Sequence, residues 1–470
     1  MLGIPLFRAQ LRAYRLSACG TLIGLSSIFA ASGCATTAGS AAYETARVDD
    51  HRSASRTSRP SRNDPAVGLK AAVLERPAYV RAVLERNPTV ESARQGWRAA
   101  LSRVKQSGAF DDPMIDLGLA PLTIGSKTAR FGYEVGISQK LPWFGKRDLE
   151  ASAAGAEASA SKSDYEAMKR ELALSAVVLY DHYFIAARSI EINVRHVELM
   201  RAMRDAATAQ FEAGRASAQD PLQAEAELAH MEHDTAIIAA QRDVAVAQMN
   251  ELLHRAPELP LPPPPLELAL PPTPGLDDAD HLETVAIAHR SEISAARQRA
   301  QGAQARADRA GRDSYPDLTV STSYNSMWDV PEHRWMVGLG FNLPIQTGRR
   351  AGAADEALAL RAQFESDASR MTDATRTQVF VALKQLQESE HVIGIFEKRL
   401  LPIARDQIDA ARAGFTASQN PFMAVVQAEK NLRSAELEYQ MARAECDLHR
   451  AELDRALGRI PGLDAQGDKP

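Results

Sequence analysis

Few residues of this 470-residue chain have the spacing of a catalytic or metal-binding site. Met327 and His333 flank a short loop between two predicted strands and could supply sulfur and nitrogen ligands to a metal ion. One Met and one His make a poor site, and the other histidines and methionines are scattered. The sequence also has no Gly-rich phosphate loop, no nucleophile elbow and no His-Glu metal motif. We therefore expect no enzyme activity, no metal and no cofactor.

Cys34 carries the one covalent modification that the sequence predicts. Residues 1–33 have a basic start, a largely apolar stretch at 16–31 and the small residues Ala31-Ser32-Gly33 directly before Cys34. This pattern is typical of a secretory signal peptide. A cysteine at the first mature position resembles a bacterial lipobox, so we expect acylation of the Cys34 thiol with a palmitate-type lipid. The alternative is an ordinary signal peptide cut near an incidental cysteine.

The destination of the mature chain follows from its next residues. Ala35 follows Cys34, where an Asp would resemble the retention signal of the inner membrane. After residue 34 no run approaches the ~18–20 apolar residues that a membrane-spanning helix needs. A mature chain that crosses a bilayer must therefore do so with β-strands. We expect a lipid-anchored protein in the outer membrane of a Gram-negative bacterium.

Composition excludes one class of partner and favours one class of fold. The formal net charge is −5, whereas a nucleic-acid binder would normally be strongly basic. Aromatic residues make up only 6% of the chain, while Ala is abundant, and this balance suits long, closely packed helices. We therefore expect no nucleic-acid partner.

The mature chain divides into two similar halves. After a flexible tether at 34–74, the halves occupy 75–256 and 276–460, with a Pro-rich linker at 257–275 between them. A disordered tail is expected at 461–470. The landmarks of the halves match in order. Ala93-Arg94-Gln95 matches Ala296-Arg297-Gln298 (296 − 93 = 203), Leu141-Pro142 matches Leu343-Pro344 (343 − 141 = 202), and Gly214 matches Gly414 (414 − 214 = 200). We infer a tandem duplication.

Four short segments alternate between apolar and polar residues, which predicts strands at about 113–122, 129–141, 316–326 and 333–344. One face of each is apolar, as in a transmembrane β-barrel, although a soluble hairpin packed on a helix would also alternate. The residues expected to face lipid are Phe131, Tyr133, Val135, Ile137, Trp335, Val337, Leu339 and Phe341. Four strands cannot close a barrel, so they must pair between subunits, and a trimer would supply twelve.

Helices are expected around these strands. The first helix of each half is predicted at about 88–106 and 291–309. Long helices should follow at 148–211 and 349–411, the second kinked by Pro402. Helices of this length need coiled-coil neighbours to bury their apolar residues.

Two similar turns, around Gly214 and Gly414, should connect these helices to the last helix of each half. We expect each glycine to end its helix with a positive φ. Asp220 or Asn420 should then cap the next helix, with the following proline in its first turn.

Several short motifs together resemble the outer membrane efflux protein family, typified by TolC. Residues 141–147, Leu-Pro-Trp-Phe-Gly-Lys-Arg, are similar to the strand-to-helix junction of its heavy-metal efflux members, and 343–350 resembles the commoner version of that junction. Tyr315-Pro316-Asp317-Leu318 and the two glycine turns also fit family positions. Each motif is weak alone, but their order and duplication make the resemblance specific over about residues 75–460.

The resemblance implies a mainly α-helical fold with a small membrane β-barrel part. Members are homotrimers with a shared twelve-stranded barrel and a long coiled-coil tunnel through the periplasm. The tunnel tips dock on a periplasmic membrane-fusion adaptor, which is coupled to an inner-membrane RND-type transporter. By position, the adaptor-docking residues would be Ala213, Gly214, Arg215, Ser217, Ala413, Gly414, Phe415 and Thr416. Asp205, Asp406 and Asp409 are candidates for a periplasmic gate, although such acids also occur on solvated helix faces.

The implied function is a passive exit duct of a tripartite efflux pump. Metal ions are the first candidate substrate because of residues 141–147, and drugs are the second. One alternative is the exit channel of a type I protein secretion system. The other is a periplasmic adaptor lipoprotein, which should have one helical hairpin and a lipoyl-like β domain rather than two hairpins and strand pairs.

Overall fold

The structure is a computed structural model, and it describes residues 44, 47–48, 72–125, 127–268, 279–417 and 419–463. The predicted signal peptide, Cys34, most of the tether, part of the linker and most of the tail lie outside these residues. Among the described residues, no helix is both long and apolar enough to cross a membrane.

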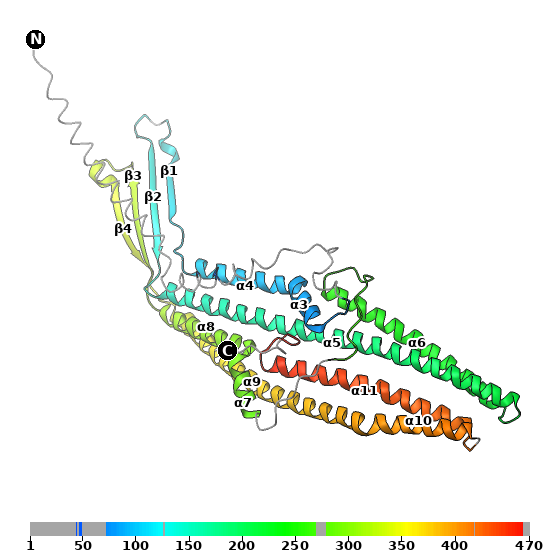
Figure 1. Cartoon of the computed structure of the whole chain (residues 1–470). Helices are drawn as coiled ribbons and strands as arrows, with labels where there is room; N and C mark the ends of the chain where they lie inside the picture. Colours follow the sequence, from blue (N-terminus) through cyan, green and yellow to red (C-terminus); the bar gives the residue numbers. More distant parts are fainter. Residues whose placement is uncertain are drawn as a thin grey trace, which may run out of the picture. The chain divides into compact units, whose positions relative to one another are not determined.

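Each half contains the same order of elements, two short helices, two strands and then long helices (Figure 1). The first half comprises α3 (Arg76–Arg86), α4 (Pro88–Ser107), β1 (Met114–Ala120), β2 (Gly132–Leu141), α5 (Lys146–Glu212) and α6 (Gln219–Leu252). The second comprises α7 (Ala279–His289), α8 (Ser291–Arg312), β3 (Leu318–Asn325), β4 (Trp335–Phe341), α9 (Thr347–Ile395), α10 (Leu401–Thr416) and α11 (Phe422–Ala456). Short 3-10 turns at Pro121–Thr123 and Pro331–Arg334 lie between the strands of each pair.

The sequence prediction omitted α3 and α7, the short helix that opens each half. Asn87 separates α3 from α4 because its extended backbone ends the first helix, and its Oδ1 accepts a hydrogen bond from the Thr89 N–H at 2.9 Å. Asn87 is therefore the N-cap of α4, and Pro88 takes the first helical position, where no N–H is needed. The predicted helix at 88–106 therefore corresponds to α4, and the short α3 before Asn87 was missed.

The long helices form as predicted, with one correction. The interruption near Pro402 is a π-helical turn at Phe396–Leu400, directly before α10. The Leu401 N–H donates to the Phe396 carbonyl, five residues back. Pro402 has no N–H to donate and its ring crowds the preceding turn, so the extra residue in the turn relieves the strain.

The four strands form one antiparallel sheet in the order β1-β2-β3-β4, inside the predicted segments. The β2–β3 pair joins the two halves of the chain, with Leu141 opposite Leu318 and Val135 opposite Tyr324. Within the described residues, β1 and β4 are edge strands, each with one side that pairs with no other strand.

The chain forms two compact units, whose boundary falls inside α4, α5, α8 and α9. The described part of the first unit holds the sheet with residues 96–162 and 295–368, and its apolar core lies around Trp97, Leu101 and Ala158. The second holds the remaining helical segments in several apolar clusters. Cys446 is buried in one of these clusters.

Candidate functional site

The sheet has one continuous apolar face. Residues that pair directly across antiparallel strands lie on the same face. One such row runs Leu117, Val135, Tyr324 and Trp335 across all four strands. The neighbouring rows on this face add Ile115, Leu119, Tyr133, Ile137, Val320, Val337, Leu339 and Phe341, together with the polar Gln139 and Thr322. Leu117 is 75% exposed and Val337 is 84% exposed, so no other part of the described chain covers the face at these positions.

The opposite face carries mostly small and polar side chains, with Met114 and Met336 as the large apolar exceptions. Its rows include Gly118, Glu134 and Asn325, and also Ser138, Ser321 and Gly338. An apolar face and a hydrophilic face on the same strands require different solvents on their two sides.

The eight residues expected to face lipid lie as follows. Seven belong to β2 or β4 and share the apolar face, with Ile137 partly buried and the others exposed. Phe131 lies just before β2, which begins where Gly132 pairs with Ala120, and its ring contacts Tyr133 with centroids 6.0 Å apart.

A polar junction connects the strands to the helices. The Nζ atom of Lys146 lies 2.9 Å from Oδ1 of Asp317 and donates to the Tyr315 carbonyl at 3.0 Å. The Trp143 N–H also donates to Asp317, and the Trp143 ring stacks on Tyr315 with centroids 5.5 Å apart. Residues 141–147 and 315–318, which are far apart in the sequence, therefore contact each other where β2 ends and β3 begins.

The turn between α5 and α6 forms the first tip (Figure 1), and it closes as predicted at Gly214. Gly214 has φ of 66°, the Arg215 N–H donates to the Gln210 carbonyl at 2.9 Å, and the Gly214 N–H donates to Phe211 at 2.9 Å. These two bonds form a Schellman motif. The predicted cap at Asp220 is wrong, because α6 already begins at Gln219 and Asp220 lies in its first turn.

The second tip, between α10 and α11, contradicts the prediction for Gly414. This glycine is not among the residues with positive φ and lies inside α10, which continues to Thr416. Its carbonyl accepts the N–H groups of Gln419 at 2.8 Å and Asn420 at 3.2 Å. A Cβ on Gly414 would lie 2.7 Å from Cγ of Asn420, so the glycine provides space for that side chain. Asn420 is not the helix cap either, because Pro421 holds that position in α11.

The two tips present different surfaces. Ala213, Gly214, Arg215 and Ser217 are all exposed in the first tip. In the second, Ala413 and Thr416 are exposed, while Gly414 and Phe415 are partly buried. The Phe415 ring packs edge-on against the buried Phe422 with centroids 5.3 Å apart.

The three acids considered for a gate lie on two helices. Asp205 is exposed on α5, and its Oδ1 accepts bonds from the Arg204 guanidinium at 2.8 and 3.0 Å. Asp406 and Asp409 are exposed on α10. Asp409 lines a groove together with Arg195 and other residues of α5, α10 and α11.

A buried polar cluster links α5 to α11, and sequence reasoning missed it. Nδ1 of His196 lies 2.8 Å from Oε1 of Glu429, and Nε2 lies 3.4 Å from Oε2 of Glu436. Burial lowers the pKa of His196, but the hydrogen bonds to both glutamates outweigh burial and raise it. For Glu436 burial acts in the other direction and raises the pKa. The hydrogen bond to His196 and the charge of Arg195 outweigh burial, so the pKa of Glu436 is lowered. The positively charged form of His196 and the negatively charged form of Glu436 therefore stabilise each other in this cluster.

The geometry around Met327 and His333 does not support a metal site there. Met327 packs against Gly132, where a Cβ would lie 2.8 Å from the Met327 Cγ, and the His333 ring contacts Trp328 edge-on with centroids 6.0 Å apart. No group of three or more His, Cys, Asp or Glu side chains suited to a metal occurs in the part of the chain that the structure describes.

Comparisons with known proteins agree with this architecture. A model of the family described as outer membrane efflux protein matches residues 79–254 and 284–459. The cobalt-zinc-cadmium resistance protein CzcC of Cupriavidus metallidurans is 30% identical over 147 residues, which are 31% of this chain and 34% of that protein. The chain thus matches about a third of the length of that relative.

Solved structures share the fold. The structure of CusC, described for its folding and transmembrane channel formation, has a TM-score of 0.70 at 16% identity and covers 86% of this chain and 98% of its own. The outer membrane protein VceC of Vibrio cholerae has a TM-score of 0.69 at 17% identity, over 81% of this chain and 95% of its own.

Proposed function

Because this chain belongs to the outer membrane efflux protein family, we propose that it is the outer-membrane exit channel of a tripartite efflux pump. As a family member it is an outer-membrane channel protein and not an enzyme. The observation that carries the finer proposal is the sheet, which has an unpartnered apolar face, a small and polar opposite face, and two free edges. A passive duct needs these surfaces and no catalytic group.

Three copies of the chain form one barrel. An open sheet edge in hydrocarbon would leave unpaired backbone groups that cost several kcal/mol each. Pairing β1 of one copy with β4 of the next removes both edges, and three copies of four strands make twelve. The apolar face then contacts lipid and the small polar face lines the lumen.

The helices continue this duct as a periplasmic tunnel. The two tips around Gly214 and Gly414 dock on a membrane-fusion adaptor that is coupled to an RND-type transporter. Asp205, Asp406 and Asp409 line the closed entrance. The lipid on Cys34, outside the described residues, anchors each copy to the outer membrane.

Metal ions or drugs are the proposed cargo. Residues 141–147 resemble the heavy-metal members of the family, and the name of CzcC assigns that protein to cobalt, zinc and cadmium resistance. A gene deletion that sensitises the cells to one of these ions, and is complemented by the wild-type gene, would support a metal. Sensitivity to drugs alone would favour the second candidate.

Disulfide crosslinking tests the barrel. A cysteine replacing Gly118 on β1, combined with one replacing Met336 or Gly340 on β4, should link neighbouring copies into covalent trimers in membranes. The control places the β1 partner on β2 instead, at Gly136, which pairs inside the sheet on both sides. Absence of any crosslink, together with purified protein that remains a soluble monomer without conductance, would contradict the proposal.

A further inference from the structure

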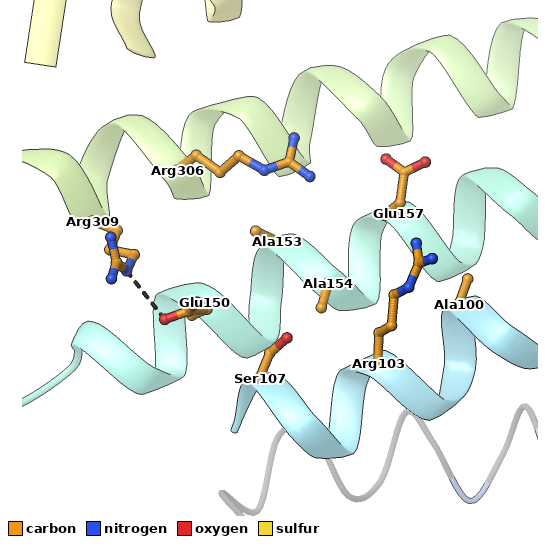
Figure 2. Close-up of a pocket in the computed structure, with 9 residues that line it drawn as sticks. All are labelled: Ala100, Arg103, Ser107, Glu150, Ala153, Ala154, Glu157, Arg306 and Arg309. Carbon is orange, nitrogen blue, oxygen red and sulfur yellow. Dashed lines mark hydrogen bonds and ion pairs between the residues drawn. The ribbon is translucent and has the colours of Figure 1, made fainter. Parts of the chain in front are cut away.

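A polar groove lies in the first unit, where α4 and α8 flank the start of α5 (Figure 2). Its volume is about 480 Å³. Figure 2 shows Arg103 extending from α4 and Arg306 extending along α8, with Glu157 of α5 in the same groove. Both arginine side chains are exposed, so a ligand in solution or at a membrane surface can reach them.

Both glutamates of the groove already have arginine partners. Glu150 accepts from Arg309 at 3.2 Å, and Glu157 lies 3.9 Å from Arg299. Neither Arg103 nor Arg306 forms an ion pair or hydrogen bond within the part of the chain that the structure describes. The residues that line the groove include three arginines and two glutamates, which gives a formal charge of +1 (3 − 2), although the whole chain is acidic.

The two unpaired arginines occupy equivalent positions of the two halves. Their separation, 306 − 103 = 203, equals the shift between Ala93-Arg94-Gln95 and Ala296-Arg297-Gln298. The fold thus brings two copies of one basic position to opposite sides of the same groove. Each guanidinium group can offer a pair of parallel N–H donors to a tetrahedral anion.

The apolar lining of the groove and its location in the fold indicate which class of ligand it could bind. Ala100, Ala153 and Ala154 line it, so it has apolar surface beside the charges. Arg103 lies four residues before the end of α4, and Arg306 lies six residues before the end of α8, which are about 6 and 9 Å of helix. Strands β1 and β3 begin a few residues further on. Basic side chains at such a boundary attract anionic lipid headgroups.

From these observations we infer that Arg103 and Arg306 form a phosphate-binding site, filled by the headgroup of a phospholipid at the periplasmic surface of the outer membrane. The lipid source rests on the proposed function, because it requires the sheet to lie in the membrane. Phosphate recognition itself depends only on the two arginines.

Titration calorimetry on the full-length protein in detergent tests the site. The probes are dihexanoyl phosphatidylglycerol and sodium phosphate at equal ionic strength. Replacing both arginines (Arg103→Gln with Arg306→Gln) should weaken lipid binding by about tenfold or more for each arginine. The matched control removes two exposed arginines of the same unit outside the groove, Arg297→Gln with Arg349→Gln, and should bind as wild type does.

The two probes separate the possible sources. Tighter arginine-dependent binding of the lipid supports a headgroup site, and equal binding of sodium phosphate supports the same site with free phosphate as its ligand. Replacing both arginines by Lys keeps the charge but removes the paired donors, and should recover only part of the affinity. Wild-type protein that binds neither probe, or a groove variant that binds both unchanged, overturns the inference. Because phosphate can be titrated without a membrane, failure of the channel proposal would not obscure this result.

Discussion

Nδ1 of His196 lies 2.8 Å from Oε1 of Glu429, and both side chains are buried, His196 with only 3% of its surface exposed. The two residues are 233 positions apart and belong to different halves of the chain. Glu436 contacts the other ring nitrogen and also pairs with Arg195 at 2.7 Å, while Arg405 acts on Glu436 from α10. A buried ion pair therefore holds α5 against α11.

This pair predicts a pH-dependent stability. The pKa of His196 is raised above its ordinary value of 6.5, so the stabilisation is fully present below 6.5 and is lost as the pH rises through the raised pKa. Glu436 has the opposite pH dependence. Because its pKa is lowered, its contribution to stability is lost only when the pH falls well into the acid range. We expect the Tm of the protein in detergent to fall as the pH is raised from about 6 to 9.

Substitution of His196 checks the source of that pH dependence. His196→Gln should lower the stability by about 3–5 kcal/mol, because Glu429 remains buried without its partner. The variant should also lose most of the fall in Tm above neutral pH. His281→Gln, at an exposed position of α7, is the control and should leave the profile unchanged. A variant of His196 with an unaltered profile would assign the pH dependence elsewhere.

The two faces of the sheet should respond differently to charge. Val135→Lys and Leu339→Lys place a charge on the apolar face, and each should cost about 2–4 kcal/mol near the middle of the membrane. Ser138→Lys, on the opposite face, should be tolerated. The readout is the fraction of protein recovered as trimer in outer-membrane fractions. Equal recovery of all three variants would contradict the assignment of the faces.

The two tip glycines should differ under substitution by alanine. Gly214→Ala forces a side chain into a positive φ, at a cost of about 1–2 kcal/mol that no neighbour can relieve. Gly414→Ala instead meets the side chain of Asn420, so the double variant with Asn420→Ala should restore the tip. Hydrogen exchange of the tip amides would measure both effects. Rescue of Gly214→Ala by Asn420→Ala, or no rescue of Gly414→Ala, would refute this difference.

Proline at either tip glycine should separate assembly from transport. Gly214→Pro is incompatible with the positive φ, and Gly414→Pro disrupts the last turns of α10 at a cost of about 3 kcal/mol. The sheet is remote in sequence from both, so trimers should still form while export fails. Export assays would measure transport, and native gels on the same membranes would measure trimer formation. Normal export by both variants would refute the assignment of these turns as docking tips.

The single free thiol of the described chain should be unreactive in the native protein. Cys446 is fully buried, and burial raises the pKa of its thiol. Iodoacetamide at neutral pH should therefore leave it unmodified until denaturant is added. Mass spectrometry of the mature protein should find the Cys446 peptide alkylated only in the denatured sample. Rapid alkylation without denaturant would mean that this helical cluster opens readily.

The sequence determined most of the secondary structure of this protein. Alternation of apolar residues located all four strands, and a long stretch without proline located α5, because these patterns reflect the solvent on each side of a single element. The matching landmarks of the halves also predicted the repeated order of elements. The pattern search placed the start of α4 correctly but missed α3, the short helix that ends at Arg86, one residue before Asn87.

Tertiary structure decided the details that depend on distant neighbours. Gly214 and Gly414 occupy similar sequences, yet only the first has a positive φ, since the second makes room for Asn420. His196 and Glu429 became partners, and Arg103 and Arg306 met across one groove, only when the two halves of the chain packed together. Local patterns report how one segment meets its solvent, whereas ion pairs and shared grooves arise from segments that the sequence places hundreds of residues apart.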